Sequence, residues 1–86
     1  MNIYVGNLNF QVKESDLQEI FENYGEVASV KIITDKYSGR SKGFGFVVME
    51  NNDEAKKAIE GLNGTSIKER EIVVNEAKPK RENFQR

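Results

Sequence analysis

Residues 42–49 are Lys42-Gly43-Phe44-Gly45-Phe46-Val47-Val48-Met49, a run of aromatic and β-branched side chains typical of a β-strand. Successive side chains of a strand point to opposite faces, so either of two sets of alternate residues could face the core. We expect the set with the smaller side chains to pack on helices; its members are Gly43, Gly45, Val47 and Met49. Phe44 and Phe46 then face solvent. In the alternative, both rings belong to the core, and Val47 and Met49 turn outward.

Three further stretches on either side of this run have strand character. Ile3-Tyr4-Val5-Gly6 predicts a strand over residues 2–7, and residues 27–34 and 71–75 predict two more. Because Ile3 and Val5 are the aliphatic pair of the first strand, we expect them to face the core, which turns Tyr4 outward. On the last strand, Ile72 and Val74 are expected to point inward. The turn between the second and third strands is predicted at residues 37–40.

Two stretches have helical periodicity. Leu17, Ile20, Phe21 and Tyr24 recur at the spacing of one helix face, as do Ala55, Ala58, Ile59 and Leu62. We predict a capping box from Ser15 and Gln18 at the start of the first helix, with a start one or two residues earlier as the alternative, and a left-handed stop at Gly25. Asn51 or Asn52 is expected to cap the second helix, and Gly61 and Gly64 to end it.

The element order is therefore β-α-β-β-α-β. This order predicts an α+β fold, a ferredoxin-like sandwich of a four-stranded antiparallel sheet with two helices on one face. The other face of the sheet is left open to solvent. Tyr4, Phe44 and Phe46 are expected on that open face, where exposed rings are costly unless a ligand covers them.

The composition excludes several kinds of site. The 86 residues include no cysteine and no histidine, so disulfides, thiolate or imidazole metal ligands and a histidine general base are absent. We expect no cofactor, no small-molecule substrate and no enzymatic activity. The Gly43-Phe44-Gly45 segment lacks the third glycine of a dinucleotide loop. No apolar run approaches the roughly 20 residues that span a membrane, so no membrane contact is expected.

The net charge of −1 hides a segregated pattern. Residues 14–30 carry a net charge of −5, whereas residues 31–43 and residues 78–86 carry +3 each. A solubilising mixture of charges is one explanation. The other is that cations flank the three rings, which is the combination that single-stranded nucleic acid needs, since bases stack on rings and cations meet the phosphates.

At these residues the sequence resembles a known family. Residues 42–49 resemble the octapeptide of the RNA recognition motif family, K/R-G-F/Y-G/A-F-V-x-F/Y, with Met49 departing at the last position. Ile3-Tyr4-Val5-Gly6-Asn7-Leu8 is similar to the family's hexapeptide. The resemblance covers about residues 2–78. Val73 replaces a residue that is more usually polar, Glu69 stands where glycine is common, and Glu71 and Glu76 are expected to weaken phosphate attraction nearby.

The resemblance implies roles in binding single-stranded RNA. Tyr4 and Phe46 would each stack one base, Phe44 would insert between sugars, and Lys42 would contact a phosphate. Asn75 and the backbone near Lys78 would read base edges, Lys31 would extend the basic rim, and Arg40 lies in a loop that often contacts RNA in this family.

The sequence thus predicts a domain over residues 1–77 and a basic tail over residues 78–86. It resembles the short single-module RNA-binding proteins of bacteria, and we expect a cytoplasmic monomer. Single-stranded DNA binding stays open as an alternative, because stacking needs no 2′-hydroxyl. A module of this fold that binds protein is a second alternative, although all three rings are present.

Overall fold

The computed structural model describes residues 1–77, so the predicted tail and Lys78 lie outside the described residues. Six strands and two helices follow in the order β1, α1, β2, β3, α2, β4, β5, β6. Their bounds are β1 Asn2–Gly6, α1 Glu14–Glu22, β2 Ser29–Thr34, β3 Ser41–Val48, α2 Asn52–Leu62, β4 Ser66–Ile67, β5 Arg70–Glu71 and β6 Val73–Glu76.

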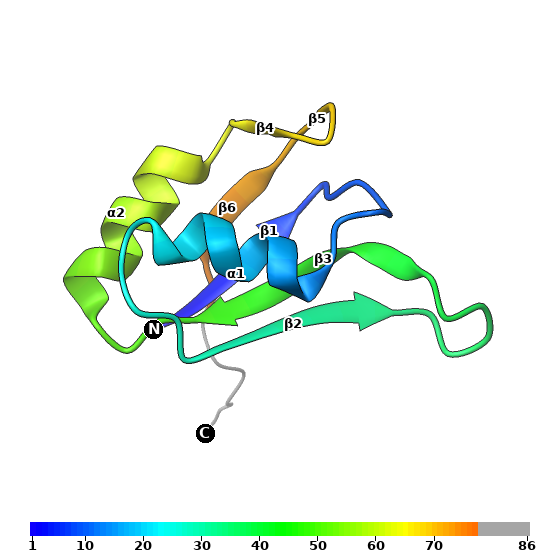
Figure 1. The fold of residues 1–86 in the computed structure, drawn as a ribbon, viewed down its shortest axis with the longest axis horizontal. Coiled ribbons are helices and arrows are strands. Elements are labelled where there is room, and N and C mark those ends of the chain that lie inside the picture. Colours follow the sequence, from blue (N-terminus) through cyan, green and yellow to red (C-terminus); the bar gives the residue numbers. More distant parts are fainter. Residues whose placement is uncertain (78–86) are drawn as a thin grey trace, which may run out of the picture.

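Four of these strands form one sheet, with the order β2-β3-β1-β6 and antiparallel neighbours throughout. Both helices cover the same face of this sheet (Figure 1). The predicted α+β sandwich is therefore confirmed. β4 and β5 form a separate short hairpin, which the sequence analysis did not predict.

The core lies between the sheet and the helices, and β3 contributes the side chains expected of it. Val47 and Met49 are fully buried, as are Ile3 and Val5 of β1. The remaining buried apolar side chains come from the loops, the helices and the other strands: Leu8, Val12, Leu17, Phe21, Ile32, Ala55, Ala58, Leu62, Ile72 and Val74. Gly45 is buried with the inward set, whereas Gly43, which has a φ of +89°, is only partly buried. The register between β2 and β3 is irregular here, since it shifts between Ile32 and Thr34. The departure at Met49 thus affects packing in the core.

Helix α1 begins and ends differently from the prediction. Its N-cap is Lys13, whose N–H donates to the Asp16 carboxylate at 2.9 Å, so the capping box predicted from Ser15 and Gln18 is wrong. Gly25 has no positive φ, so the left-handed stop is wrong as well. A Cβ on Gly25 would instead come within 2.7 Å of the Glu54 Cβ. Gly25 therefore allows the turn after α1 to lie against α2.

Helix α2 follows the prediction at its start. Asn51 is the N-cap, and its side chain accepts from the Glu54 N–H at 3.0 Å. At the other end, Gly61 lies inside the helix, where a Cβ would come within 2.8 Å of the Tyr24 ring, and Gly64 follows the helix with a φ of +86°. Gly61 therefore serves the contact with Tyr24, and only Gly64 follows the end of the helix as expected.

Strand β2 is an edge of the four-stranded sheet, and a side chain of α1 accepts a hydrogen bond from its backbone. The Glu14 carboxylate, in the first turn of α1, accepts from the Ile32 N–H of β2 at 3.1 Å. This N–H belongs to the side of β2 that has no neighbouring strand in the described residues. A hydrogen bond from an edge backbone group to a helix side chain fixes α1 along the sheet.

The turn of the β4–β5 hairpin has an unusual backbone. Lys68 and Glu69 both have positive φ, 49° and 70°, which is the conformation of the two central residues of a type I′ turn. Asparagine and glycine are preferred there because the left-handed region costs other residues energy. Glu69, where the resemblance led us to expect glycine, adopts the left-handed conformation that glycine favours.

Replacing Glu69 with glycine should therefore stabilise the domain. We expect Glu69→Gly to raise the free energy of unfolding by about 0.5–1 kcal/mol, because relief of the left-handed strain outweighs the added chain entropy. Chemical denaturation measures this change. The matched control is Glu60→Gly in α2, which should lower stability by about 1 kcal/mol. A loss of stability in Glu69→Gly would contradict the turn assignment.

Candidate nucleic-acid interface

Four side chains form a row across the open face of the sheet. The strand registers place Lys31 of β2 opposite Phe46 of β3, Phe46 opposite Tyr4 of β1, and Tyr4 opposite Asn75 of β6. Directly opposite residues of antiparallel strands share a face. Because the neighbours of Tyr4 along β1 are fully buried toward the helices, this row faces away from them. The predicted outward positions of Tyr4 and Phe46 are confirmed.

The three rings contact one another. The ring centroids of Tyr4 and Phe44 lie 6.0 Å apart, those of Tyr4 and Phe46 also 6.0 Å, and those of Phe44 and Phe46 6.2 Å. The two Phe rings are nearly perpendicular at 89°, the edge-to-face arrangement that aromatic quadrupoles favour. All three are partly exposed. We call Tyr4, Phe44 and Phe46 the ring face.

Gly6 supports the ring face in a way that the sequence analysis missed. A Cβ on Gly6 would come within 2.7 Å of the Tyr4 ring, so the ring lies over the Gly6 backbone. Gly6 is opposite Val73 of β6, which is 40% exposed on the same side, as predicted. The signal in the sequence was a glycine two residues after an outward tyrosine.

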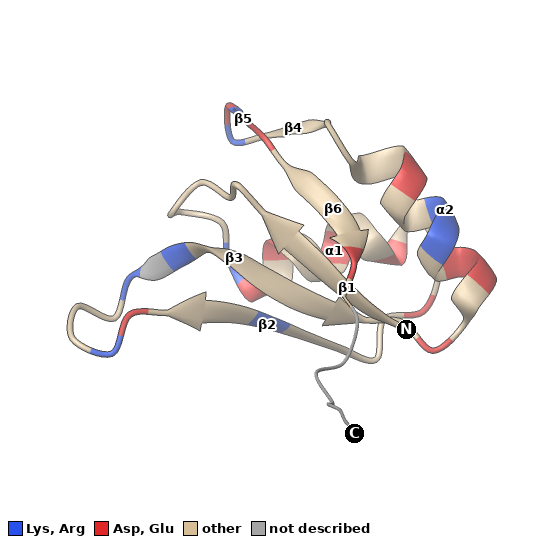
Figure 2. Ribbon diagram, turned by 180° about the vertical axis from the view of Figure 1, so that it is seen from behind, with Lys and Arg blue, Asp and Glu red and all other residues tan. Residues whose placement is uncertain are grey.

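The predicted cationic side chains do not all lie beside the rings. Lys31 stands in the row beside Phe46, and Lys42 is exposed two residues before Phe44 on β3. Arg40 is exposed in the turn between β2 and β3, beyond the end of the ring face. Figure 2 shows basic positions within β2 and β3, seen from the side of the sheet that carries no helix. The fold therefore gathers Tyr4, Phe44, Phe46, Lys31 and Asn75, whereas Arg40 stands apart.

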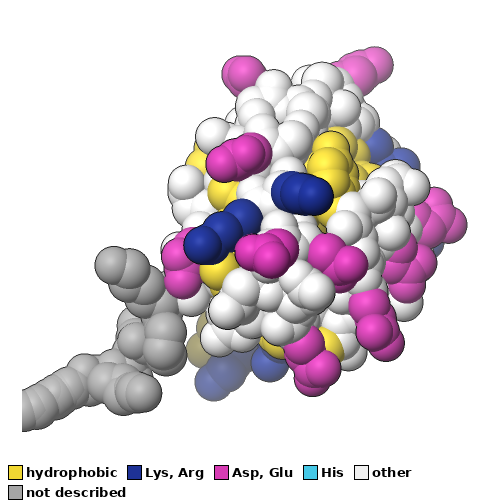
Figure 3. All heavy atoms as spheres, turned by 90° about the vertical axis from the view of Figure 1, so that its left-hand side faces the viewer, with side chains coloured by type: hydrophobic (Ala, Val, Ile, Leu, Met, Phe, Trp, Pro, Cys, Tyr) yellow, Lys and Arg dark blue, Asp and Glu magenta, His cyan; other side chains and the backbone are white. Residues whose placement is uncertain are grey.

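The acidic residues lie mostly on the other side of the molecule. Those of α1 and α2 belong to the helix layer, and the end of the domain where α2 lies is rich in acidic side chains (Figures 2 and 3). Glu76 is opposite Ile3, which faces the helices, so the register directs Glu76 to the helix side of the sheet. We expected Glu76 to weaken phosphate attraction near the last strand; although Glu76 adjoins Asn75 in the chain, its register places it on the face opposite the row.

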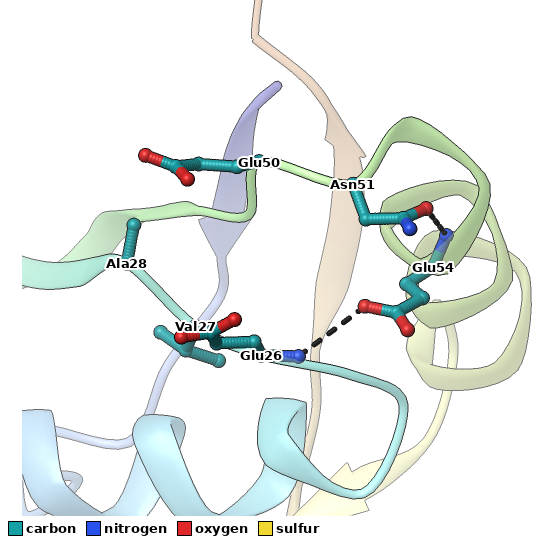
Figure 4. Close-up of a pocket in the computed structure, with 6 residues that line it drawn as sticks. All are labelled: Glu26, Val27, Ala28, Glu50, Asn51 and Glu54. Carbon is teal, nitrogen blue, oxygen red and sulfur yellow. Dashed lines mark hydrogen bonds between the residues drawn. The ribbon is translucent and has the colours of Figure 1, made fainter.

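A hollow at the end of the domain is also acidic. It is lined by Glu26, Val27, Ala28, Glu50, Asn51 and Glu54, from the loops before β2 and after β3 and from the start of α2 (Figure 4). The Glu54 carboxylate accepts from the Glu26 N–H at 3.3 Å, so it joins α2 to the loop before β2. Within residues 1–77, no group of three or more potential ligands could hold a metal ion. An acidic lining repels phosphate and sets this hollow apart from the ring face.

Two asparagines connect the end of β1 to the β4–β5 hairpin. The Asn7 side chain accepts from the Arg70 guanidinium at 2.8 Å and donates to the Glu71 carbonyl, and the Asn9 side chain donates to the Lys68 carbonyl at 2.9 Å. These contacts span about 60 residues of sequence, so local patterns did not indicate them. They hold the hairpin at the end of the sheet where Gly6 and Val73 lie.

The geometry of this face agrees with a family-wide sequence pattern. The sequence profile of the RNA recognition motif matches residues 3–73. The chain belongs to the RNA recognition motif family. Among curated proteins, this RNA recognition motif chain is similar to the putative RNA-binding protein RbpA of Synechocystis, with 49% identity over 93% of this chain and 79% of that protein. It is also similar to the putative RNA-binding protein RbpF of Nostoc, with 46% identity over 93% of this chain and 76% of that protein.

Solved structures extend the likeness to the whole backbone of the RNA recognition motif. The crystal structure of RNA-binding protein PG1 has a TM-score of 0.88 and 49% identity, covering 93% of this chain and 99% of that one. A Sex-lethal protein in complex with RNA has a TM-score of 0.87 and 26% identity, covering 92% of this chain and 47% of that one. The predicted resemblance to the family, and to RNA-binding proteins of bacteria, is thereby confirmed.

The turn that carries Arg40 is held by one carboxylate. The Asp35 Oδ1 atom accepts from the Tyr37 N–H at 2.7 Å and from the Ser38 N–H at 3.2 Å. The backbone of Asp35 also bonds to that of Arg40 and Gly39, at 2.7 and 2.9 Å. The two N–H donors, with the nearby Lys42 ammonium adding a smaller effect, lower the pKa of Asp35 below its ordinary value of 3.8.

The lowered pKa predicts how the turn depends on pH. Because the folded-state pKa of Asp35 lies below the unfolded value, its carboxylate stabilises the turn at all pH values above the unfolded pKa of about 3.9. That stabilisation is lost as the pH falls through the folded-state pKa. We expect the amide resonances of Tyr37 and Ser38 to titrate below pH 3.8 in NMR spectra. In Asp35→Asn this titration should vanish; a midpoint at or above the ordinary value would contradict the assignment.

Proposed function

We propose that this protein binds single-stranded RNA by stacking bases on the ring face. The observation that carries the proposal is the row Lys31, Phe46, Tyr4, Asn75, which places two rings between a cation and an amide on one exposed face. Base stacking on exposed rings contributes about 1–3 kcal/mol per base. The relatives named as RNA-binding proteins and the family membership support the same function.

Each residue of the interface has a proposed role. Tyr4 and Phe46 each stack one base, and Phe44 packs against the sugars between them. Asn75 reads a base edge, since its amide offers both a donor and an acceptor. Lys31, Lys42 and Arg40 meet phosphates, as Lys78 would from outside the described residues. We also propose that residues 1–77 form the binding domain and that residues 78–86 add positive charge.

We infer that the protein acts by binding rather than by catalysis. The chain lacks the histidine and cysteine side chains that most often serve as bases and nucleophiles. Neither helix in residues 1–77 is long and apolar enough to cross a membrane. The cytoplasmic location and the monomeric state stay predictions.

Single-stranded DNA is a second candidate ligand, and one observation supports it. Gly6 and Val73, which adjoin the Tyr4 ring on the open face, have no side-chain group that could bond to a 2′-hydroxyl. Selection from a random RNA pool alongside a matching DNA pool compares the two ligands directly. Equal enrichment from both pools would mean that the ring face does not distinguish the sugars.

Removal of a ring should weaken RNA binding without unfolding the domain. We expect Phe46→Ala and Tyr4→Ala each to lower affinity for a short single-stranded RNA by about 1–3 kcal/mol, measured by fluorescence anisotropy. Phe46→Leu separates stacking from apolar bulk, because it keeps the bulk and lacks the ring; it should lose most of the same affinity. Phe46→Tyr keeps a ring and should bind as the unaltered protein does. Unchanged affinity in both alanine variants would refute the stacking proposal.

The dependence of affinity on salt should be shallow. About two to four phosphate contacts predict a slope of log affinity against log salt near −1.5 to −3 for a single strand. Lys31→Ala should make that slope shallower by about 0.7, because one contact is lost. Lys57→Ala in α2, on the helix side, is the matched control and should leave the slope unchanged. A slope steeper than about −5 would contradict the small number of contacts.

A further inference from the structure

The loop after α2 contains a dipeptide that is chemically unstable in proteins. Of the asparagines in the chain, Asn63 alone is followed by glycine. Deamidation of asparagine begins when the backbone nitrogen of the next residue attacks the side-chain amide carbon. Glycine, which has no Cβ, hinders this attack least, and asparagine is among the thermolabile residues of proteins. Neither Asn63 nor Gly64 belongs to the ring face, so the dipeptide lies outside the candidate interface.

Both groups that take part in such a reaction are hydrogen-bonded to β6 or to the residue before it. The Asn63 Oδ1 atom accepts from the Val74 N–H at 3.0 Å, and the Gly64 N–H donates to the Ile72 carbonyl at 2.9 Å. Attack requires that the Gly64 nitrogen lose its proton and that the side-chain amide carbon of Asn63 turn toward it. Both hydrogen bonds therefore oppose the reaction in the folded domain.

The backbone around the dipeptide is held in the same way. Asn63 is the C-cap of α2 with a ψ of 124°, and its N–H donates to the Ile59 carbonyl at 3.0 Å. The Thr65 N–H donates to the Leu62 carbonyl at 3.0 Å, and the Thr65 carbonyl accepts from the Ile72 N–H at 2.9 Å. The loop is thus bonded to the helix on one side and to the start of β6 on the other. A local opening of these contacts is needed to release it.

Deamidation would change the bonding of this loop in a defined way. A bond forms between the Gly64 nitrogen and the Asn63 Cγ atom, the bond from Cγ to Nδ2 breaks, and ammonia leaves with the proton of the Gly64 nitrogen. Water then opens the cyclic imide at one of its two carbonyls. One product is aspartate, whose carboxylate can still accept from the Val74 N–H. The other is isoaspartate, which adds one carbon to the main chain and so alters the spacing that both hydrogen bonds require.

We propose that Asn63 is a deamidation site controlled by the α2–β6 junction, by which we mean residues 62–65 and 72–74. While the junction is closed, the two hydrogen bonds of the dipeptide keep the reaction slow. When the junction opens locally, Asn63 reacts, and the isoaspartate product leaves a permanent break between α2 and β6. Since β6 also carries Asn75, the break loosens the strand at the edge of the candidate interface.

The test compares rates of deamidation in one buffer. The folded protein and a synthetic peptide of residues 60–67 are incubated at mildly alkaline pH, and conversion at Asn63 is followed by peptide mass spectrometry. We expect conversion in the folded protein to be at least about tenfold slower than in the peptide, because the junction must open first. In urea, Asn63 should convert faster than the other asparagines of the chain. Equal rates in the folded protein and the peptide would overturn the inference, as would no conversion in urea.

Two matched truncations distinguish opening of the junction from unfolding of the whole domain. Leu62 and Leu17 are both buried, the first at the end of α2 and the second in α1. Leu62→Ala should accelerate conversion at Asn63 at least about fivefold more than Leu17→Ala does, because its cavity lies at the junction. Equal acceleration would overturn control by the junction, since the whole domain would then have to unfold. If either variant fails to fold, the comparison between the unaltered protein and the peptide decides the inference.

Hydrogen exchange tests the break between α2 and β6. In the purified isoaspartate form, we expect the amide hydrogens of Gly64 and Val74 to exchange at least about tenfold faster than in the unaltered protein. Asn63→Asp is the control, because it keeps an acceptor for the Val74 N–H without lengthening the main chain, and it should keep the protection of Val74. Unchanged exchange in the isoaspartate form would overturn the proposed break. None of these measurements involves RNA, so their outcome is independent of the function proposed for the ring face.

Discussion

The close approach of β3 to β2 at Gly45 is the constraint on which the ring face depends. A Cβ on Gly45 would meet the Lys31 carbonyl oxygen and lie 3.0 Å from the Ile32 Cα, both backbone atoms of the neighbouring strand. Backbone atoms in a sheet have little room to shift, so only glycine fits. Gly45 therefore allows β3 to lie this close to β2, at a position on the inward side of β3. Val47 and Met49 follow it inward, and Phe44 and Phe46 are left on the outside.

The same division into two faces also organises the charges. The helix layer carries most of the acidic residues, and the register directs even Glu76 of β6 to that side. Lys31 shares the open face with the rings. The net charge of −1 over the whole chain is therefore the sum of unlike parts: an acidic helix layer, basic positions on and beside the open face, and residues 78–86, which carry +3. A negatively charged strand would be repelled from the helix side and would approach the sheet from the ring face.

Local sequence patterns predicted the faces of the sheet but not the contacts between distant segments. The alternation around Tyr4 and Phe46 was sufficient to predict that both rings face outward. Once one set of alternating side chains is assigned to the core, the other set must lie on the opposite face. The helix ends were harder: Asp16 caps α1 from inside its first turn, and Gly25 serves a contact with Glu54 of α2. The β4–β5 hairpin escaped prediction because Lys68 and Glu69 are atypical of its turn, which Asn9 helps to hold from far along the chain.

The hydrogen bond from the Ile32 N–H to the Glu14 carboxylate has a consequence beyond the position of α1. Unpaired N–H groups on an edge strand are templates to which a strand of another molecule can add, the first step toward sheet-to-sheet aggregation. Here the carboxylate occupies the donor that an incoming strand would need, and it brings a negative charge to the edge. One side chain of α1 thus removes a donor through which a further strand could add to the edge of β2.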